Sequence, residues 1–142
     1  MIFNFNNKKI IIKSKRSKFM FCEDKEKEFT QLITINKNGR IEFESFNFNN
    51  ELKRKEKKKL KIKGTKLIDD IKTVLEKRGI EPVAKDAGIW EVEIINKKNT
   101  TNYFGILGDE NNCVLYDNLT ISNYLKGIID IQDLILLDDK ID

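Results

Sequence analysis

The sequence predicts a single α+β domain over residues 1–142, with a mainly antiparallel sheet built from hairpins and two helices packed on one face. Three observations lead to this fold class: alternation of apolar and charged residues at 90–94, an Asn-Gly turn between two β-rich runs, and apolar residues at helical spacing within 65–78. Because hairpins and not β-α-β crossovers supply the connections, antiparallel pairing is expected. A chain of 142 residues is long enough to build one core without disulfides or metals.

The N-terminal region contains three short apolar clusters, at residues 2–5, 10–12 and 19–22. Lysine, arginine and serine fill residues 13–18 between the second and third clusters. This pattern favours one or two strands separated by a basic turn. A charged connector at 23–28 follows.

A first hairpin is predicted around Asn38 and Gly39. Residues 29–35 are rich in β-branched and aromatic side chains, which favour a strand. The Asn-Gly pair is typical of a type I′ turn, in which both central residues need a positive φ. The return strand at 40–48 alternates until Ser45, where the apolar phase slips by one residue, and this slip predicts a β-bulge or the end of the strand.

The clearest helix signal follows Gly64. Thr65 is expected to cap the helix, Asp69 and Asp70 lie towards the positive end of its dipole, and Gly79 follows its last residues. One apolar stripe is formed by Leu67, Ile68, Ile71, Val74 and Leu75.

The strand at 90–95 organises the C-terminal half. Side chains alternate with period two, so Glu91 and Glu93 share the solvated face, and Trp90, Val92 and Ile94 share the other. The predicted core consists of Trp90, Val92, Ile94, Ile71, Val74 and Leu75.

The remaining elements follow in order. A turn at 96–99 leads to a return strand at 100–105, and a short apolar segment occupies 113–116. Helical spacing predicts a second helix at 119–129. Residues 131–137 either prolong this helix or form a final strand, and an acidic tail, residues 138–142, closes the chain.

The stretch around Trp90 resembles a strand found in a group of small uncharacterised bacterial proteins. Their pattern is Asp-Gly-x-x-Trp-x-Leu/Val-x-Ile, followed by a turn, a strand ending in glycine, and a closing helix. The corresponding residues are Asp86, Gly88, Trp90, Val92 and Ile94, although Ala87 separates the first two. The resemblance implies the same strand-turn-strand-helix order and carries no known activity.

The residue types argue against an enzyme. The chain contains no histidine, so the usual serine, cysteine and metal hydrolase designs lose their base or ligand. We expect no cofactor and no metal. The carboxylate pairs have simpler structural or solubilising roles; they are Glu91 with Glu93, Asp69 with Asp70, and Asp138 with Asp139.

Three further features favour a cytoplasmic protein. Cys22 and Cys113 lie far apart and outside any C-x-x-C pair, which suggests two reduced thiols, with a single disulfide left open. No apolar run approaches the roughly 20 residues of a membrane span. Asparagines interrupt the N-terminus where a signal peptide would be apolar.

The most basic segment carries the functional prediction. Between residues 51 and 66 there are nine basic and two acidic residues, whereas the whole chain carries a net charge of +4. We expect a non-enzymatic inhibitor or immunity protein, acting in toxin immunity or in anti-defence of the anti-CRISPR kind, that binds an acidic surface of a toxin or defence nuclease. The predicted partner-binding residues are Lys53, Arg54, Lys55, Lys57, Lys58, Lys59, Lys61 and Lys63.

Nucleic-acid binding through residues 53–66 is the alternative. Clustered cations gain affinity by releasing counterions from phosphates, and Lys13, Lys15, Arg16 and Lys18 would add to the cluster if the fold brought them near. Against it, aromatic residues are not interleaved with the lysines as a stacking surface requires. The sequence leaves the oligomeric state open.

Overall fold

The protein has an α+β fold, as its sequence predicts. The computed structural model describes residues 7–16, 27–60, 62–77, 88–96, 99–107, 114–116 and 119–136. The strands are β1 (Asn7–Lys15), β2 (Thr30–Asn36), β3 (Arg40–Phe46), β4 (Leu52–Lys59), β5 (Ile89–Asn96), β6 (Thr100–Ile106), β7 (Val114–Tyr116) and β8 (Leu119–Thr120), and the helices are α1 (Gly64–Lys77) and α2 (Ile121–Ile128).

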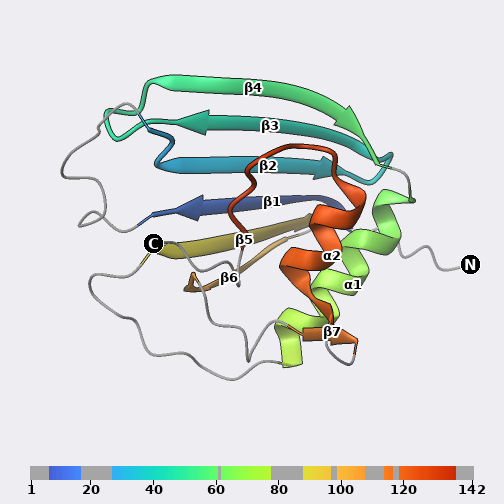
Figure 1. Cartoon of the computed structure of the whole chain (residues 1–142). Helices are drawn as coiled ribbons and strands as arrows, with labels where there is room; N and C mark the ends of the chain where they lie inside the picture. Colours follow the sequence, from blue (N-terminus) through green and yellow to red (C-terminus); the bar gives the residue numbers. More distant parts are fainter. Residues whose placement is uncertain are drawn as a thin grey trace, which may run out of the picture.

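One six-stranded antiparallel sheet dominates the molecule, in the order β4-β3-β2-β1-β5-β6 (Figure 1). Both predicted hairpins are present, as β2–β3 and β5–β6. The first strand, β1, lies between them and pairs with β2 on one side and β5 on the other. The N-terminal strand therefore joins the two halves of the chain into one sheet, with β4 at one edge and β6 at the other.

The basic turn predicted at 13–18 is wrong over its first three residues, because β1 continues to Lys15. Lys13 and Lys15 alternate with Ser14, which is buried. Two neighbouring strands hydrogen-bond this stretch, so it stays extended despite its charge. The apolar clusters predicted at 2–5 and 19–22 lie outside the described residues.

The β2–β3 turn lies at the predicted place but is of another type. Gly39 has a φ of 91°, and the Gly39 N–H donates to the Asn36 carbonyl at 2.9 Å. Asn38 does not have the positive φ that a type I′ turn would require. A single glycine in the left-handed region, closing a longer loop, is the usual alternative that keeps the strands in register.

The predicted end of the return strand after Ser45 is confirmed, whereas the bulge found at this point has its extra residue in β4 and not in β3. The register of β3 against β4 shifts between Ser45 and Phe46, with Arg54 and Leu52 as their partners, so Lys53 is the extra residue of a bulge. The strand β3 itself ends at Phe46.

Apolar side chains from the sheet, both helices and the C-terminal segment form one core cluster. Of the six predicted core residues, five are at most 2% exposed, and Val74 is half-buried and packs against the cluster. The buried sheet and helix members are Ile10, Ile12, Ile33, Ile35, Ile41, Phe43, Trp90, Val92, Ile94, Leu67, Ile68, Ile71, Leu75, Ile121 and Leu125.

Helix α1 begins at Gly64, so Thr65 is an exposed residue inside the first turn and not the expected cap. A Cβ at position 64 would lie 2.3 Å from the Asn36 carbonyl oxygen, so only glycine lets the helix start this close to the β2–β3 turn. Asp70 lies beyond the first turn, so it is not placed to interact with the positive end of the helix dipole as expected. It forms an ion pair with Lys66 at 2.8 Å instead.

The C-terminal region differs in detail from the prediction. Residues 119–120 pair with β7 in a small two-stranded sheet, so α2 starts only at Ile121. Residues 131–136 are neither helix nor strand, although four of them, Ile131 and 134–136, are buried. Asp133 adopts a φ of 58°, which both regular structures exclude. The acidic tail at 138–142 and both cysteines lie outside the described residues.

Candidate interface at the lysine-rich edge strand

The basic segment forms an edge strand, which the sequence analysis did not predict. Six of the eight predicted partner-binding residues lie in β4, Lys63 lies exposed just before α1, and Lys61 lies outside the described residues. Lysine and glutamate are poorly represented in strands, so β4 gives little strand signal of its own. Its conformation comes from hydrogen bonding to β3.

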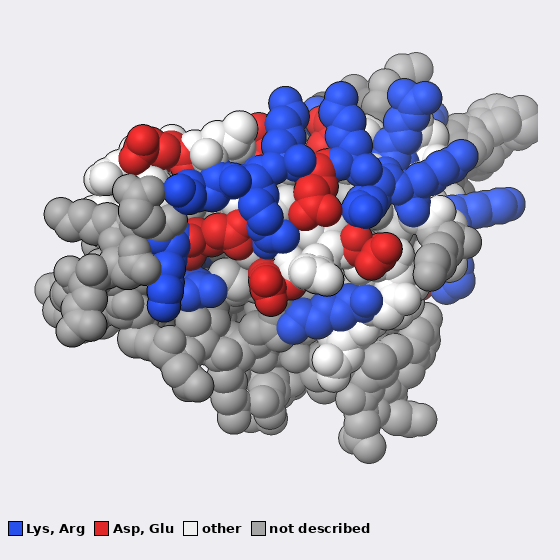
Figure 2. Space-filling model, turned by 45° about the horizontal axis from the view of Figure 1, so that its top comes forward, with Lys and Arg blue, Asp and Glu red and all other residues white. Residues whose placement is uncertain are grey.

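Three lysines form a row on the outer face of β4. Lys55 lies opposite Glu44, and Lys57 lies opposite Glu42. Lys59 completes this outer lysine row (Lys55, Lys57 and Lys59), and all three are exposed. Figure 2 shows lysine and arginine side chains gathered along the upper edge of the molecule, with acidic side chains between them. Alternate residues of a strand lie about 7 Å apart, so the three lysines leave the backbone at even intervals on one face.

The intervening residues of β4 face the core side. Arg54 and Glu56 lie opposite Ser45 and Phe43, both of which are fully buried, and residues directly opposite one another share a face. The Arg54 guanidinium lies over the Phe43 ring, 4.7 Å from its centroid, in a cation–π contact. Arg54 therefore contributes to packing and is less available to a partner than the outer lysine row.

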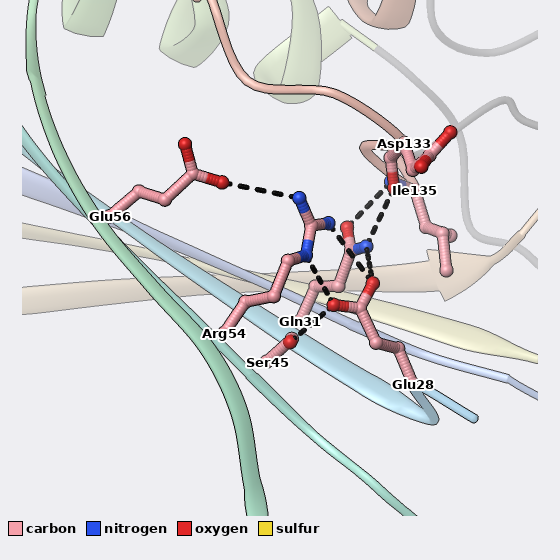
Figure 3. Close-up of polar contacts among 7 residues, drawn as sticks. All are labelled: Glu28, Gln31, Ser45, Arg54, Glu56, Asp133 and Ile135. Carbon is pink, nitrogen blue, oxygen red and sulfur yellow. Dashed lines mark hydrogen bonds and ion pairs between the residues drawn. The ribbon is translucent and has the colours of Figure 1, made fainter. Parts of the chain in front are cut away.

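A carboxylate fixes the position of Arg54 (Figure 3). Arg54 donates through Nε to Glu28 Oε2 and through Nη2 to Glu28 Oε1, the latter at 3.0 Å, and Nη1 pairs with Glu56 at 3.2 Å. Ser45 also donates to Glu28. Burial alone would raise the pKa of Glu28, but the hydrogen bonds from Arg54 and Ser45, the Arg54 charge and Gln31 together lower it. Glu28 is therefore held as a carboxylate.

Gln31 extends this network to the C-terminal segment. Its side chain, 1% exposed, donates to the Asp133 carbonyl at 2.7 Å and accepts from the Ile135 N–H at 2.6 Å (Figure 3). An amide side chain here satisfies backbone groups that a strand neighbour would otherwise satisfy. The same carboxylate, Glu28, thus connects β4 to β2, and Gln31 connects β2 to residues 133–135.

The backbone of the outer lysine row points away from β3. The Leu60 N–H donates to the Gly39 carbonyl at 2.7 Å, and hydrogen-bonded pairs alternate along an antiparallel ladder. In this register Lys58, Glu56 and Arg54 exchange hydrogen bonds with β3. The N–H and C=O groups of the lysine row are therefore directed to the outer edge, where none of the described residues forms a further strand.

Sequence reasoning missed Glu28, Gln31 and Ser45. A signal for two of them was present in the alternation of the strands. Gln31 lies on the same face of β2 as Ile33, and Ser45 lies on the same face of β3 as Phe43. Each therefore places a polar side chain on a face that is otherwise apolar. Buried polar side chains need hydrogen-bond partners, which predicts a network. The partner, Glu28, lies in a run of charges and has no distinguishing pattern.

The described residues contain no group of three or more carboxylate or other metal-binding side chains that could hold a metal ion, and none of their helices is long and apolar enough to cross a membrane. Compared with protein-family models, with curated proteins and with solved structures, the chain gives no significant match.

Proposed function

We propose that this protein is a non-enzymatic binding module that occupies an acidic surface of a partner protein through the outer lysine row. The observation that carries the proposal is the arrangement of β4: an edge strand with six cationic residues and one acidic residue, whose outer lysine row points to solvent while Arg54 is hydrogen-bonded to Glu28. Networks of this kind hold the strand in place, so the lysines are presented by a fixed backbone.

An inhibitory role in the cytoplasm is the setting we propose for this binding. Immunity proteins and inhibitors of defence nucleases, including anti-CRISPR proteins, act by occupying another protein and need no catalytic residues. A charged patch speeds association with a complementary surface and helps to exclude other partners. We further propose that both helices cover the same face of the sheet, since their side chains share one core cluster with the strands and Figure 1 draws both on one side.

Nucleic acid is a less suitable partner for this surface. Glu42 and Glu44 lie directly beside Lys57 and Lys55, so charges of both signs alternate across the outer face and do not form the continuous basic surface along which a phosphate chain lies. Among the described residues two aromatic side chains are exposed: Phe104, at 60% exposure, lies in β6 at the opposite edge, and Phe48, at 38%, lies between β3 and β4 and packs edge-to-face on Phe29. Bases stacked on Phe104, the more exposed of the two rings, would therefore be far from the lysines.

The test is affinity capture from a lysate of the source organism, with and without nuclease treatment, using wild-type protein and two variants. One variant carries Lys55→Gln, Lys57→Gln and Lys59→Gln. The matched control removes the same charge from exposed lysines outside β4: Lys27→Gln, Lys37→Gln and Lys126→Gln. We expect one stoichiometric protein, resistant to nuclease, that the control retains and the β4 variant loses.

Two results would contradict the proposal. Equal capture by the β4 variant and the control would show that the lysine row is not the interface. Capture that disappears on nuclease treatment would establish nucleic acid as the ligand.

A further inference from the structure

The outer edge of β4 carries backbone hydrogen-bonding groups that pair with none of the described strands, and it carries positive charge as well. Lys55, Lys57 and Lys59 direct both N–H and C=O outward, and their side chains lie on one face of the same strand. A ligand that satisfies all of these groups must offer donors and acceptors in alternation, together with negative charge on one face.

We propose that the partner contributes an extended acidic segment that pairs with the outer edge of β4 as a seventh strand, with Asp or Glu at alternate positions opposite Lys55, Lys57 and Lys59. This inference rests on the proposed function and specifies how the partner binds. Strand addition of this kind gains affinity from backbone hydrogen bonds and specificity from alternate side chains.

The charges on β4 argue against a second copy of the chain as the added strand. Pairing β4 with another β4 would bring lysine close to lysine along the strand, and like charges across a strand pair are destabilising. Lysines on edge strands commonly prevent such self-pairing. The same lysines favour a strand of opposite charge, so one feature excludes the copy and selects the acidic segment.

The outward carbonyl groups argue against a phosphate backbone. An oligonucleotide phosphate accepts hydrogen bonds but donates none, so the C=O groups of the lysine row would face like partial charges. A peptide strand satisfies both kinds of group.

The experiment uses capped octapeptide probes of alternating threonine and glutamate, titrated into the full-length protein while backbone amide shifts are followed by NMR. We expect saturable shifts centred on the amides of Lys55, Lys57 and Lys59. A control peptide with the same residues, but with its four glutamates consecutive, places fewer carboxylates on the lysine face and binds more weakly.

Backbone pairing is tested by two N-methylated forms of the alternating peptide, which have equal charge and composition. In the proposed register the glutamate N–H groups face β4 and the threonine N–H groups face away. N-methylation of the glutamates should weaken binding by at least about tenfold, since several hydrogen bonds are lost, whereas N-methylation of the threonines should change it by less than about threefold.

A protein variant gives the complementary test. Lys57→Pro removes an outward N–H and leaves the ladder to β3 intact, as proline is tolerated on the open side of an edge strand. Lys57→Gln removes the same charge and keeps the N–H. We expect the proline variant to bind the alternating peptide about fivefold more weakly than the glutamine variant, with unchanged circular dichroism.

The outcomes separate the two proposals. Suppose that both N-methylated peptides bind the protein equally, and that the Lys57→Pro and Lys57→Gln variants bind the alternating peptide equally. Strand addition is then wrong, while charge-based binding to an acidic protein still stands. If no acidic peptide binds, and the triple variant with Lys55→Gln, Lys57→Gln and Lys59→Gln captures the same material as wild type, the proposed function fails as well. Saturable binding of an oligothymidylate probe in place of the peptides would overturn both in favour of nucleic acid.

Discussion

The strands β4 and β5 have the same length of eight residues and the same antiparallel pairing, but they are held in opposite ways. In β5, alternate residues are buried, and Trp90 is completely enclosed. In β4 no residue is buried, and the strand is fixed by the hydrogen bonds of β3 and by Arg54. The strand β5 is thus stabilised by its own buried side chains, whereas β4 is stabilised by its neighbour β3. The lysines of β4 are therefore available for binding.

The largest difference between the two strands should appear on truncation of their side chains. Trp90→Ala should reduce the free energy of unfolding by about 3–5 kcal/mol, because it removes a large buried side chain and leaves a cavity. Lys57→Ala should change it by less than about 0.5 kcal/mol. Chemical denaturation followed by circular dichroism measures both, and a mild effect at Trp90 would contradict its central place in the core.

Within β4, Arg54 should behave unlike its lysine neighbours. Arg54→Met should reduce the free energy of unfolding by about 2 kcal/mol, because it leaves the partly buried Glu28 carboxylate without a charged donor. Lys58→Met is the matched control, since Lys58 also faces the core side but is exposed, and its effect should stay within about 0.5 kcal/mol. Equal effects in denaturation experiments would mean that the Glu28 network does not hold the strand.

Low pH should weaken the ion pair between Arg54 and Glu28 that holds β4 in place. Hydrogen bonds from Arg54, Ser45 and Gln31, together with the Arg54 charge, lower the pKa of Glu28 in the folded state against the effect of burial. The unfolded chain therefore binds the proton more tightly, so the stability that Glu28 contributes is present above its ordinary pKa of 4.5 and is lost as the pH falls further.

Thermal unfolding of wild type and Glu28→Gln between pH 7 and pH 3 measures this contribution. We expect wild type to be more stable at pH 7 and the difference to shrink below about pH 4.5. A difference that stays constant across this range would show that the Glu28 carboxylate is not stabilised in the fold.

The contrast between β4 and β5 also explains how far the sequence could predict this structure. The alternation around Trp90 and the helical stripe from Leu67 to Leu75 arise because one face of each element is buried. These patterns therefore predicted β5, α1 and most of the core. In β4 the conformation is imposed by β3, so its residues contain almost no pattern of burial. The basic composition identified the candidate interface, but the separation of Arg54 from the lysine row depends on strand register, which only the fold reveals.

The last comparison is between β4 as it is and β4 without its outer charges. Replacing Lys55, Lys57 and Lys59 with valine should change the free energy of unfolding only slightly, by about 0.5 kcal/mol or less per residue, since these side chains are exposed. The variant should nevertheless self-associate, because an apolar edge strand with outward N–H and C=O groups can pair with a second copy. Sedimentation velocity over a concentration series, with Lys27, Lys37 and Lys126 replaced by valine as the control, measures this effect. If the β4 variant sediments as wild type does, the lysines are not what keeps this edge from pairing, and their charge is then explained by binding alone.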